Sequence, residues 1–179
     1  MPRLWENFGN VTGKRILFID GASRGNPGRA AIGISVTDEK GIETESLAEA
    51  IGHATNNEAE YRAVLRGMEL ARKHRAAELE IRTDSELLAR QLKGSYRVRA
   101  ENLKPLWAQA RQALARFKYV NIVIIPRALN RRADALANQA LDEINNPPPN
   151  PLPNREREHT PSPLRGEGRD EGRKHNPKL

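Results

Sequence analysis

The 179-residue chain contains no cysteine, and this absence excludes several kinds of chemistry at once. Without thiols there are no disulfide bonds, no thiolate metal sites and no cysteine nucleophile. Long apolar runs are also missing, because the longest are about the length of one buried strand and far short of a membrane-spanning helix. Residues Met1 to Asn7 lack the apolar core of a signal peptide. We therefore expect a soluble, cytoplasmic protein without membrane association.

Positive charge is abundant but unevenly distributed along the sequence. The net charge is +7, and the segment from Leu88 to Arg132 contains eleven Lys or Arg residues against one acid, Glu101. Any single arginine in this segment is equally typical of a solvated helix face. The segment as a whole favours a surface that faces a polyanion.

Hydrophobic periodicity predicts an α/β fold that begins with a meander of strands. We expect antiparallel strands over residues 14–21, 30–37 and 42–51, with turn signals between them. Further along, the pattern predicts two more strands, at 78–82 and 119–125, and four helices, at 57–74, 84–92, 103–117 and 130–143. This order predicts a mixed five-stranded sheet, three antiparallel strands and then two parallel ones, with helices on both faces.

Composition divides the chain into three parts. Residues 14–144 carry the periodic pattern and form the predicted catalytic domain, which follows a short N-terminal extension, residues 1–13. Residues 145–179 are rich in proline, glycine and charge and contain almost nothing apolar. We expect this segment to be a disordered tail.

Four acidic residues stand at positions where a carboxylate is unfavourable unless a cation gathers it. Asp20 ends an apolar strand in Asp-Gly-Ala-Ser-Arg-Gly-Asn-Pro-Gly, and Glu60 lies near a helix start in Thr-Asn-Asn-Glu-Ala-Glu-Tyr. Asp84 follows a strand in Thr-Asp-Ser, and Asp134 lies in the first turn of the last helix in Asn-Arg-Arg-Ala-Asp. Carboxylates from four distant segments predict a divalent-metal site for phosphodiester chemistry.

Each of these acids also suits an ordinary structural role. Asp20 suits the cap of a turn, and Glu60 suits a surface salt bridge. Asp84 is a good helix N-cap, and Asp134 is a common kind of helix-start residue. The joint pattern, and no single residue, favours the metal site.

In order and spacing, these motifs resemble those of type 1 ribonucleases H, the ribonuclease HI family, which cut the RNA strand of RNA–DNA hybrids. The resemblance covers residues 14–141 and rests on Asp-Gly-x-x-x-Gly-Asn-Pro-Gly, Thr-Asn-Asn-x-x-Glu, Thr-Asp-Ser and Asn-x-x-x-Asp. It implies the ribonuclease H-like fold and two Mg²⁺ ions, with Mn²⁺ as a substitute, held by Asp20, Glu60, Asp84 and Asp134. It also implies a monomeric endonuclease without sequence preference, whose products carry a 5′-phosphate and a 3′-hydroxyl.

The resemblance implies contacts with both strands of the hybrid. Backbone groups at Gly21, Ala22 and Ser23, together with Glu60, are expected to read the 2′-hydroxyls of the RNA strand. Glu58, two residues before Glu60, is expected to face solvent.

On the DNA side, the resemblance implies a phosphate pocket and a minor-groove contact. Asn26, Arg29 and Thr55 correspond to the pocket for a DNA-strand phosphate, and Asn56 and Asn57 to minor-groove readers. The asparagines also suit turn and cap positions, and both roles can hold together.

The chain departs from the common family pattern in two places. Many relatives carry a histidine in the loop before the last helix, whereas this loop, Pro126–Leu129, has Arg127, as in a histidine-free subgroup. We expect Arg127 to steady the leaving phosphate as a fixed charge, because a pKa above ~12 prevents it from acting as an acid; an ordinary surface arginine is the alternative. The stretch Lys93–Asn102 is too short for the basic handle helix of some relatives, so we expect weaker hybrid affinity.

Two other functions remain open at this level. One is a module that binds hybrids or double-stranded RNA with little turnover, which the missing histidine favours and the four intact carboxylates disfavour. The other is a nuclease that prefers duplex RNA.

Overall fold

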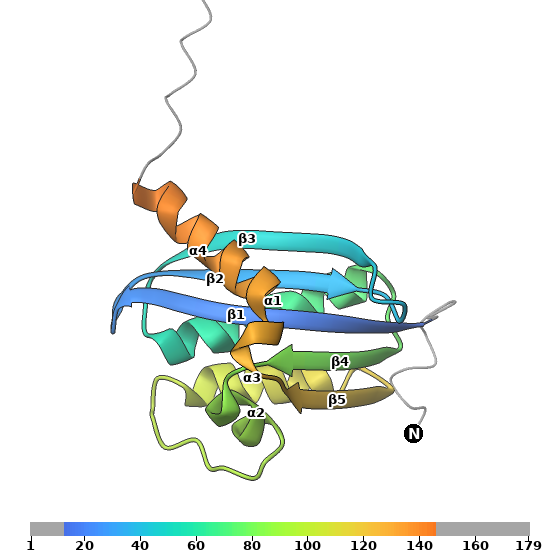
Figure 1. Cartoon of the computed structure of the whole chain (residues 1–179). Coiled ribbons are helices and arrows are strands. Elements are labelled where there is room, and N and C mark those ends of the chain that lie inside the picture. Colours follow the sequence, from blue (N-terminus) through green and yellow to red (C-terminus); the bar gives the residue numbers. More distant parts are fainter. Residues whose placement is uncertain (1–12, 146–179) are drawn as a thin grey trace, which may run out of the picture. The chain divides into compact units, whose positions relative to one another are not determined.

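A five-stranded mixed sheet lies at the centre of the computed structural model, which describes residues 13–145 (Figure 1). Its strands are β1 (Lys14–Gly25), β2 (Gly28–Thr37), β3 (Glu43–Ala54), β4 (Glu78–Thr83) and β5 (Tyr119–Ile124). The order across the sheet is β3-β2-β1-β4-β5, with β1, β2 and β3 antiparallel and β1, β4 and β5 parallel. The predicted topology, three antiparallel strands and then two parallel ones, is confirmed.

Helices pack on both faces of this sheet, as predicted (Figure 1). They are α1 (Asn56–Lys73), α2 (Glu86–Leu92), α3 (Lys104–Leu114) and α4 (Arg131–Asn145), with a short 3₁₀ turn, η1 (Arg127–Leu129), before α4. Alternation along β2 shows which face each long helix covers: Ile34 points toward α1, whereas the neighbouring Gly33 meets the backbone of α4. No helix among residues 13–145 combines the length and apolar character needed to cross a membrane.

The larger core fills the space between the sheet and α1, α2 and α3. Its largest fully buried side chains come from the sheet, α1 and α2: Leu17, Ile19, Ile32, Ile34, Tyr61, Met68, Leu79, Ile81, Leu88 and Leu92. Under α4 the packing is closer and uses small residues, and the predicted apolar stripe of this helix is buried: Ala133, Leu136, Ala137, Ala140 and Leu141. Small side chains let α4 approach the sheet closely.

Several element boundaries differ from the prediction, each for a local reason. The first hairpin continues four residues beyond Gly21, because β1 and β2 stay paired as far as Gly25 and Gly28 despite their polar side chains. Helix α2 begins later than predicted: Ser85 is its N-cap, with Oγ accepting from Leu88 N at 3.3 Å, so the prediction that Asp84 starts this helix is wrong. The predicted extension and tail, residues 1–13 and 145–179, lie outside the described residues except for Gly13 and Asn145.

Candidate active site

A cavity of about 170 Å³ lies beside β1 just beyond the end of β4. Its walls contain all four predicted metal ligands, together with six other residues: Gly21, Ala22, Asn56, Ser85, Arg127 and Asn138. Pairing between β1 and β4 stops at Phe18, so Asp20 lies on the part of β1 that continues past β4. The prediction that Asp20 ends its strand is therefore wrong; the strand runs on, and Asp20 faces the space that β4 leaves open.

Gly21 brings the first turn of α1 against β1. A β-carbon at this position would lie 2.3 Å from the backbone nitrogen of Glu60 and 2.3 Å from the carbonyl carbon of Ala59, which is far inside van der Waals contact. Only a residue without a side chain permits this approach. Because Gly21 adjoins Asp20, the contact places the Glu60 carboxyl beside Asp20.

Gly33 plays the matching role on the opposite face of the sheet. It pairs with Asp20 across the β1–β2 ladder, and a β-carbon there would lie 2.0 Å from Ala133 O and 2.5 Å from Ala137 N. Helix α4 therefore rests with its backbone on β2 at the level of Asp20. This contact delivers Asp134, the residue after Ala133, to the same cavity.

Asn130 ties Asp84 to the first strand. Its Nδ2 group donates to Ile19 O at 2.8 Å and to Asp84 Oδ1 at 2.9 Å, and the side chain is fully buried. Asn130 also accepts a hydrogen bond from Asp134 N through its backbone oxygen, at 3.1 Å. One buried asparagine, through its side-chain amide and its backbone oxygen, thus links three of the four segments that carry the carboxylates.

The other carboxyls are held by neutral or positive groups. Glu60 accepts from Ser85 Oγ at 2.7 Å and from Asn56 Nδ2 at 3.3 Å. Asp134 accepts from Arg127 Nη2 at 2.7 Å and from Asn138 Nδ2 at 3.3 Å. Glu60, Asp84 and Asp134 therefore have defined orientations at the cavity.

Burial and mutual repulsion raise the pKa of two of the acids. The pKa of Asp20 is raised to about 7, first by burial and then by the charges of Asp84 and Asp134, while Arg127 opposes the rise. Burial also raises the pKa of Glu60 to about 7, against the hydrogen bond from Ser85 and with help from the charges of Asp20 and Asp84. Neutral pH thus lies within the titration range of both groups, so a nearby cation would strongly favour their ionised forms.

The donor set fits a hard divalent cation. Carboxylate oxygens are the ligands that Mg²⁺ and Mn²⁺ prefer, and burial together with neighbouring carboxylates raises the pKa values of Asp20 and Glu60, which a bound cation would lower. Within residues 13–145, however, no three acidic or histidine side chains are yet drawn together as ligands of one ion. Like charges repel at short range, so the carboxyls stay on their own hydrogen-bond partners.

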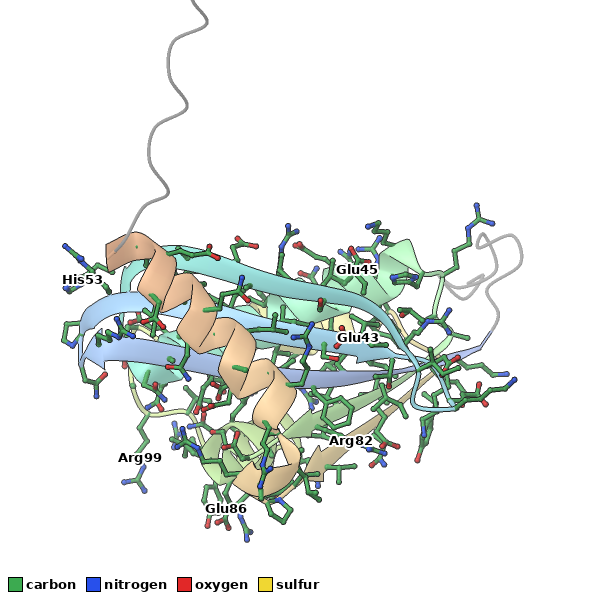
Figure 2. All side chains as sticks on the ribbon, turned by 45° about the horizontal axis from the view of Figure 1, so that its top comes forward. Glu43, Glu45, His53, Arg82, Glu86 and Arg99 are labelled. Atoms are coloured by element: carbon green, nitrogen blue, oxygen red, sulfur yellow. The ribbon has the colours of Figure 1, made fainter. Side chains whose placement is uncertain are left out.

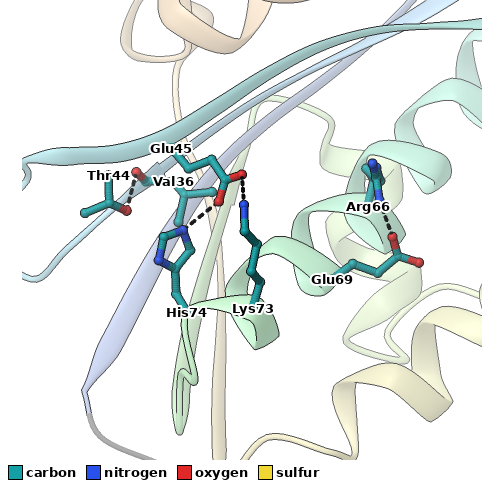
Figure 3. Close-up of polar contacts among 7 residues, drawn as sticks. All are labelled: Val36, Thr44, Glu45, Arg66, Glu69, Lys73 and His74. Carbon is teal, nitrogen blue, oxygen red and sulfur yellow. Dashed lines mark hydrogen bonds and ion pairs between the residues drawn. The ribbon is translucent and has the colours of Figure 1, made fainter.

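Arg127 lies in η1, at the rim of the cavity, with 77% of its side chain exposed. Its ion pair with Asp134 and its effect on the pKa of Asp20 place a positive charge beside two of the predicted ligands. Neither described histidine lines the cavity: His53 projects from the surface of β3 (Figure 2), and His74 pairs with Glu45 (Figure 3). The structure thus brings the predicted loop residue to the site, without a histidine.

The predicted substrate residues form a rim between the first hairpin and the start of α1. Asn26 Oδ1 accepts from Asn56 N at 3.1 Å, and Thr55 is the N-cap of α1. Asn26 therefore has the capping role that was its alternative, and through Asn56 it adjoins the cavity, whereas neither Asn26 nor Thr55 lines the cavity itself. Arg29 lies exposed on β2, opposite His53 on β3, and Asn57 is exposed in the first turn of α1.

Two features of the site were not predicted from the sequence. Glu58 is part-exposed and does not line the cavity, but its capping role was not predicted: it accepts from Thr55 N at 2.8 Å and from Thr55 Oγ1 at 2.7 Å and so closes a capping box. The Thr-x-x-Glu spacing was the available signal. Ser85 suits the N-cap position that it occupies, but its bond to Glu60 and the orienting roles of Asn130 and Asn138 were not predicted, since nothing local distinguishes these residues from cap and helix-start residues.

A family model, two curated relatives and two solved structures are similar to this chain. Residues 18–140 match a family model described as reverse transcriptase-like. Ribonuclease HI of Halobacterium salinarum is 44% identical over 127 residues, which cover 70% of this chain and 63% of that protein. The bifunctional protein Rv2228c of Mycobacterium tuberculosis is 41% identical over 131 residues, covering 72% of this chain and 36% of that protein. The chain therefore spans less than two thirds of the length of these relatives.

Solved structures match over nearly their whole length. The crystal structure of RNase H1 from Halobacterium salinarum has a TM-score of 0.72 and 41% identity, covering 73% of this chain and 99% of that one. LC11-RNase H1, solved in complex with an RNA/DNA hybrid, has a TM-score of 0.70 and 39% identity, covering 73% of this chain and 98% of that one. The sheet and the helices around it account for this likeness.

Proposed function

This chain belongs to the type 1 ribonuclease H family, and we propose that it is an endoribonuclease that hydrolyses the RNA strand of RNA–DNA hybrids. The observation that carries the proposal is the convergence of Asp20, Glu60, Asp84 and Asp134 on one cavity. The likeness to a ribonuclease H1 solved with an RNA/DNA hybrid supports this choice of substrate. Cleavage would leave a 5′-phosphate and a 3′-hydroxyl and would not depend on sequence.

Divalent metal ions are the cofactor class of this family, and we propose two Mg²⁺ ions, replaceable by Mn²⁺, held by the four carboxylates. When bound, such ions supply a nucleophilic water and stabilise the charge that develops on the leaving 3′ oxygen. For this chemistry Asp20 and Glu60 must be ionised, although their pKa values near 7 leave them partly protonated at neutral pH. Activity should therefore rise with pH until both carboxyls are fully ionised.

The surrounding residues hold these ligands in place. Ser85 and Asn56 fix both oxygens of Glu60, and Asn130 fixes one oxygen of Asp84. Arg127 contributes a permanent positive charge at the rim, where we propose that it steadies the leaving phosphate without transferring a proton.

We propose that the hybrid lies across the rim of this cavity. The backbone at Gly21, Ala22 and Ser23 would read RNA 2′-hydroxyls, a contact that separates RNA from DNA. The DNA strand would pass over Asn26, Arg29 and the start of α1, with Thr55 at a phosphate and Asn56 and Asn57 in the minor groove.

Basic residues also lie on α2 and in the loop that follows it. Here the Arg90 guanidinium lies 5.1 Å from the centre of the Tyr96 ring, and Arg97 is exposed in the loop that follows. Arg99, in the same loop, projects from the surface (Figure 2). Buried Val98 and Leu103 anchor this loop to the domain. We propose that it replaces the missing handle in reduced form, with correspondingly weaker binding of the hybrid.

The remaining proposals concern the setting of the enzyme. We propose a monomer in the cytoplasm that acts on hybrids and, more slowly, on double-stranded RNA. A module that binds hybrids without cutting them is disfavoured, because such a module gains nothing from gathering four carboxyls in one cavity, two of them with raised pKa values.

The deciding experiment is a cleavage assay with end-labelled RNA–DNA hybrid, duplex RNA and duplex DNA. Each substrate is incubated with the full chain in Mg²⁺, in Mn²⁺ and in a chelator. We expect cleavage of the hybrid in both metals, slow cleavage of duplex RNA and none of duplex DNA. Binding of the hybrid without cleavage in either metal would refute the proposed function.

A further inference from the structure

Strand β3 contains an extra residue, Thr44, between Glu43 and Glu45. Across the β2–β3 ladder Thr37 pairs with Glu43 and Val36 pairs with Glu45, so Thr44 has no partner of its own and forms a bulge. Thr44 Oγ1 donates to Val36 O at 3.2 Å (Figure 3). Residues two apart in a regular strand point to the same face, but a bulge places them on opposite faces.

The bulge sends the two glutamates to different helices. Glu45 accepts from Lys73 Nζ and His74 Nε2, both at 2.7 Å, at the end of α1 (Figure 3). Glu43 instead points toward α4, where it accepts from Arg132 Nε and Nη2, both at 3.0 Å. Two carboxylates that are neighbours in the strand thus hold elements in different layers of the domain.

Glu43 is well fixed on the sheet side of its contact with α4. It accepts from Ser35 Oγ at 2.6 Å, and Ser35 lies buried on β2 two residues after Gly33. The paired hydrogen bonds from Arg132 lower the pKa of Glu43, so the ion pair is intact at neutral pH. Arg132 is therefore attached to the sheet by a planar, two-pronged contact of defined geometry.

Arg132 lies in the first turn of α4, two residues before Asp134. The nearby contact of α4 with Gly33 is backbone against backbone and lacks an interlocking side chain, so by itself it leaves the helix free to slide or turn by a small amount. A two-pronged ion pair beside that contact removes this freedom. The carboxyl of Asp134 moves with any rotation of this turn.

We propose that Glu43 and Arg132 form a clamp that sets the rotation of the first turn of α4 and so positions the Asp134 carboxyl at the active site. They are positioning residues, since neither lines the cavity. The proposal rests on the proposed function, because the position of Asp134 matters only if Asp134 is a metal ligand.

A positioning role and a purely stabilising role predict different results. The ion pair is largely exposed, with 54% of the Arg132 side chain and 36% of the Glu43 side chain accessible, so its loss should change the melting temperature little. A small displacement of a ligand, by contrast, reduces turnover markedly. The clamp should therefore affect kcat more than stability.

The test compares Arg132→Met, Glu43→Gln, Arg132→Lys and the charge-swapped pair Glu43→Arg with Arg132→Glu. For the first two we expect kcat on the hybrid to fall about three- to tenfold and the Mg²⁺ requirement to rise, with KM for the hybrid unchanged. Arg132→Lys and the swapped pair should recover part of the loss. Glu45→Gln is the matched control, because it breaks the equivalent contact on α1, and it should leave kcat unchanged.

A second measurement needs no activity. In metal-free protein, hydrogen exchange of the backbone amides from Asp134 to Ala137 should be faster in Arg132→Met than in the parent and unchanged in Glu45→Gln. Parent-like kcat and parent-like exchange in Arg132→Met would overturn the clamp. A rise in KM alone would also overturn it, by making Arg132 a substrate contact. If the parent itself fails to cut the hybrid, the proposed function fails, while hydrogen exchange still decides whether the clamp exists.

Discussion

Asp20 and Glu80 lie on neighbouring strands and on the same face of the sheet, yet the pKa of Asp20 is raised and the pKa of Glu80 is lowered. Only 9% of the Glu80 side chain is exposed, and this burial raises its pKa, but hydrogen bonds from Lys14 and Arg82 outweigh it and hold the pKa below its usual range. Arg82 is itself fixed above the Phe18 ring, 5.2 Å from its centre. Burial is also the main cause at Asp20, and the charges of Asp84 and Asp134 add to it, so its pKa rises to about 7 although Arg127 and a hydrogen bond from the Gly21 backbone oppose the rise.

The same contrast separates the other acids of the domain. Among the described carboxyls with a resolved shift, hydrogen-bonded partners lower the pKa of Glu43, Glu45 and Glu58. Only the two cavity acids, Asp20 and Glu60, have raised pKa values. Burial alone therefore does not mark a functional carboxylate in this protein. At Asp20 and Glu60 the burial is not offset by a strong cationic partner, so a metal ion would supply the positive charge that these two carboxyls lack.

Removing the Asp20 charge should have the largest effect. Asp20→Asn should lower kcat on the hybrid at least about a thousandfold, because a ligand of the proposed metal site loses its charge while the fold keeps its shape. Steady-state cleavage at saturating Mg²⁺ measures this loss. Glu80→Gln is the matched control, since it neutralises a buried carboxyl on the same face that already has cationic partners. Cleavage by Asp20→Asn at a rate near that of the parent would contradict the metal-site assignment.

Metal-free stability should reveal the repulsion directly through its pH dependence. The folded-state pKa values of Asp20 and Glu60, about 7, exceed their ordinary values of 3.8 and 4.5, so the folded state binds protons more tightly than the unfolded state. The stability that these protons provide is complete below about pH 4 and is lost as the pH rises to about 7, at about 1.4 kcal/mol for each unit by which the pKa is raised.

Urea denaturation in a chelator at several pH values measures this term. The difference in unfolding free energy between the parent and Asp20→Asn isolates it from other titrating groups. The parent should become less stable relative to Asp20→Asn as the pH rises from 4 to 8. A difference that stays constant with pH would show that Asp20 is not held at a raised pKa.

Loss of the rim charge should have an intermediate effect. Arg127→Ala should slow cleavage roughly ten- to a hundredfold, about 1.4–2.8 kcal/mol, because a fixed positive charge beside the leaving phosphate is gone. The same change should move the acid limb of the pH–rate profile to higher pH, since Arg127 opposes the raised pKa of Asp20. Arg127→Lys should restore part of both effects. Single-turnover rates across pH measure them, and parent-like rates in Arg127→Ala would make the residue ordinary surface charge.

The smallest effect should come from the paired carboxyls. Glu80→Gln should lower the free energy of unfolding by about 1–2 kcal/mol at pH 7, because Lys14 and Arg82 lose a charged partner in a mostly buried setting. Glu45→Gln should lower it by less than about 1 kcal/mol, because its Lys73 partner is 67% exposed. Equal losses in urea denaturation would show that burial does not distinguish these two ion pairs.

Much of the fold was predictable because its signals are local. The alternation in Ala30–Thr37 and the apolar stripe of α4 depend on residues a few positions apart, so the sequence predicts them without knowledge of the partner elements. Capping is equally local, although the capping box of Thr55 and Glu58 was overlooked. The strand ends were predicted less well, since pairing of the first hairpin continues through polar residues to Gly25 and Gly28.

The sequence by itself also determined which acids belong to the site, because each of the four stands in a short motif of fixed order. It could not show how they meet. That depends on Gly21 and Gly33, whose missing side chains let α1 and α4 rest on the sheet. Each glycine acts by contact with an element that is distant in the chain, so the local sequence does not predict these contacts.

Only the tertiary structure decided the roles of the remaining polar residues. Asn130 bonds to Ile19 across 111 positions of sequence, and Arg132 bonds to Glu43 across 89. The lowered pKa of Glu80 likewise depends on Lys14, which the parallel pairing of β1 with β4 places beside it. Charge interactions act over a few ångströms in space, whatever the separation along the chain, and so the chemistry of each carboxyl is decided by the folded neighbours that surround it.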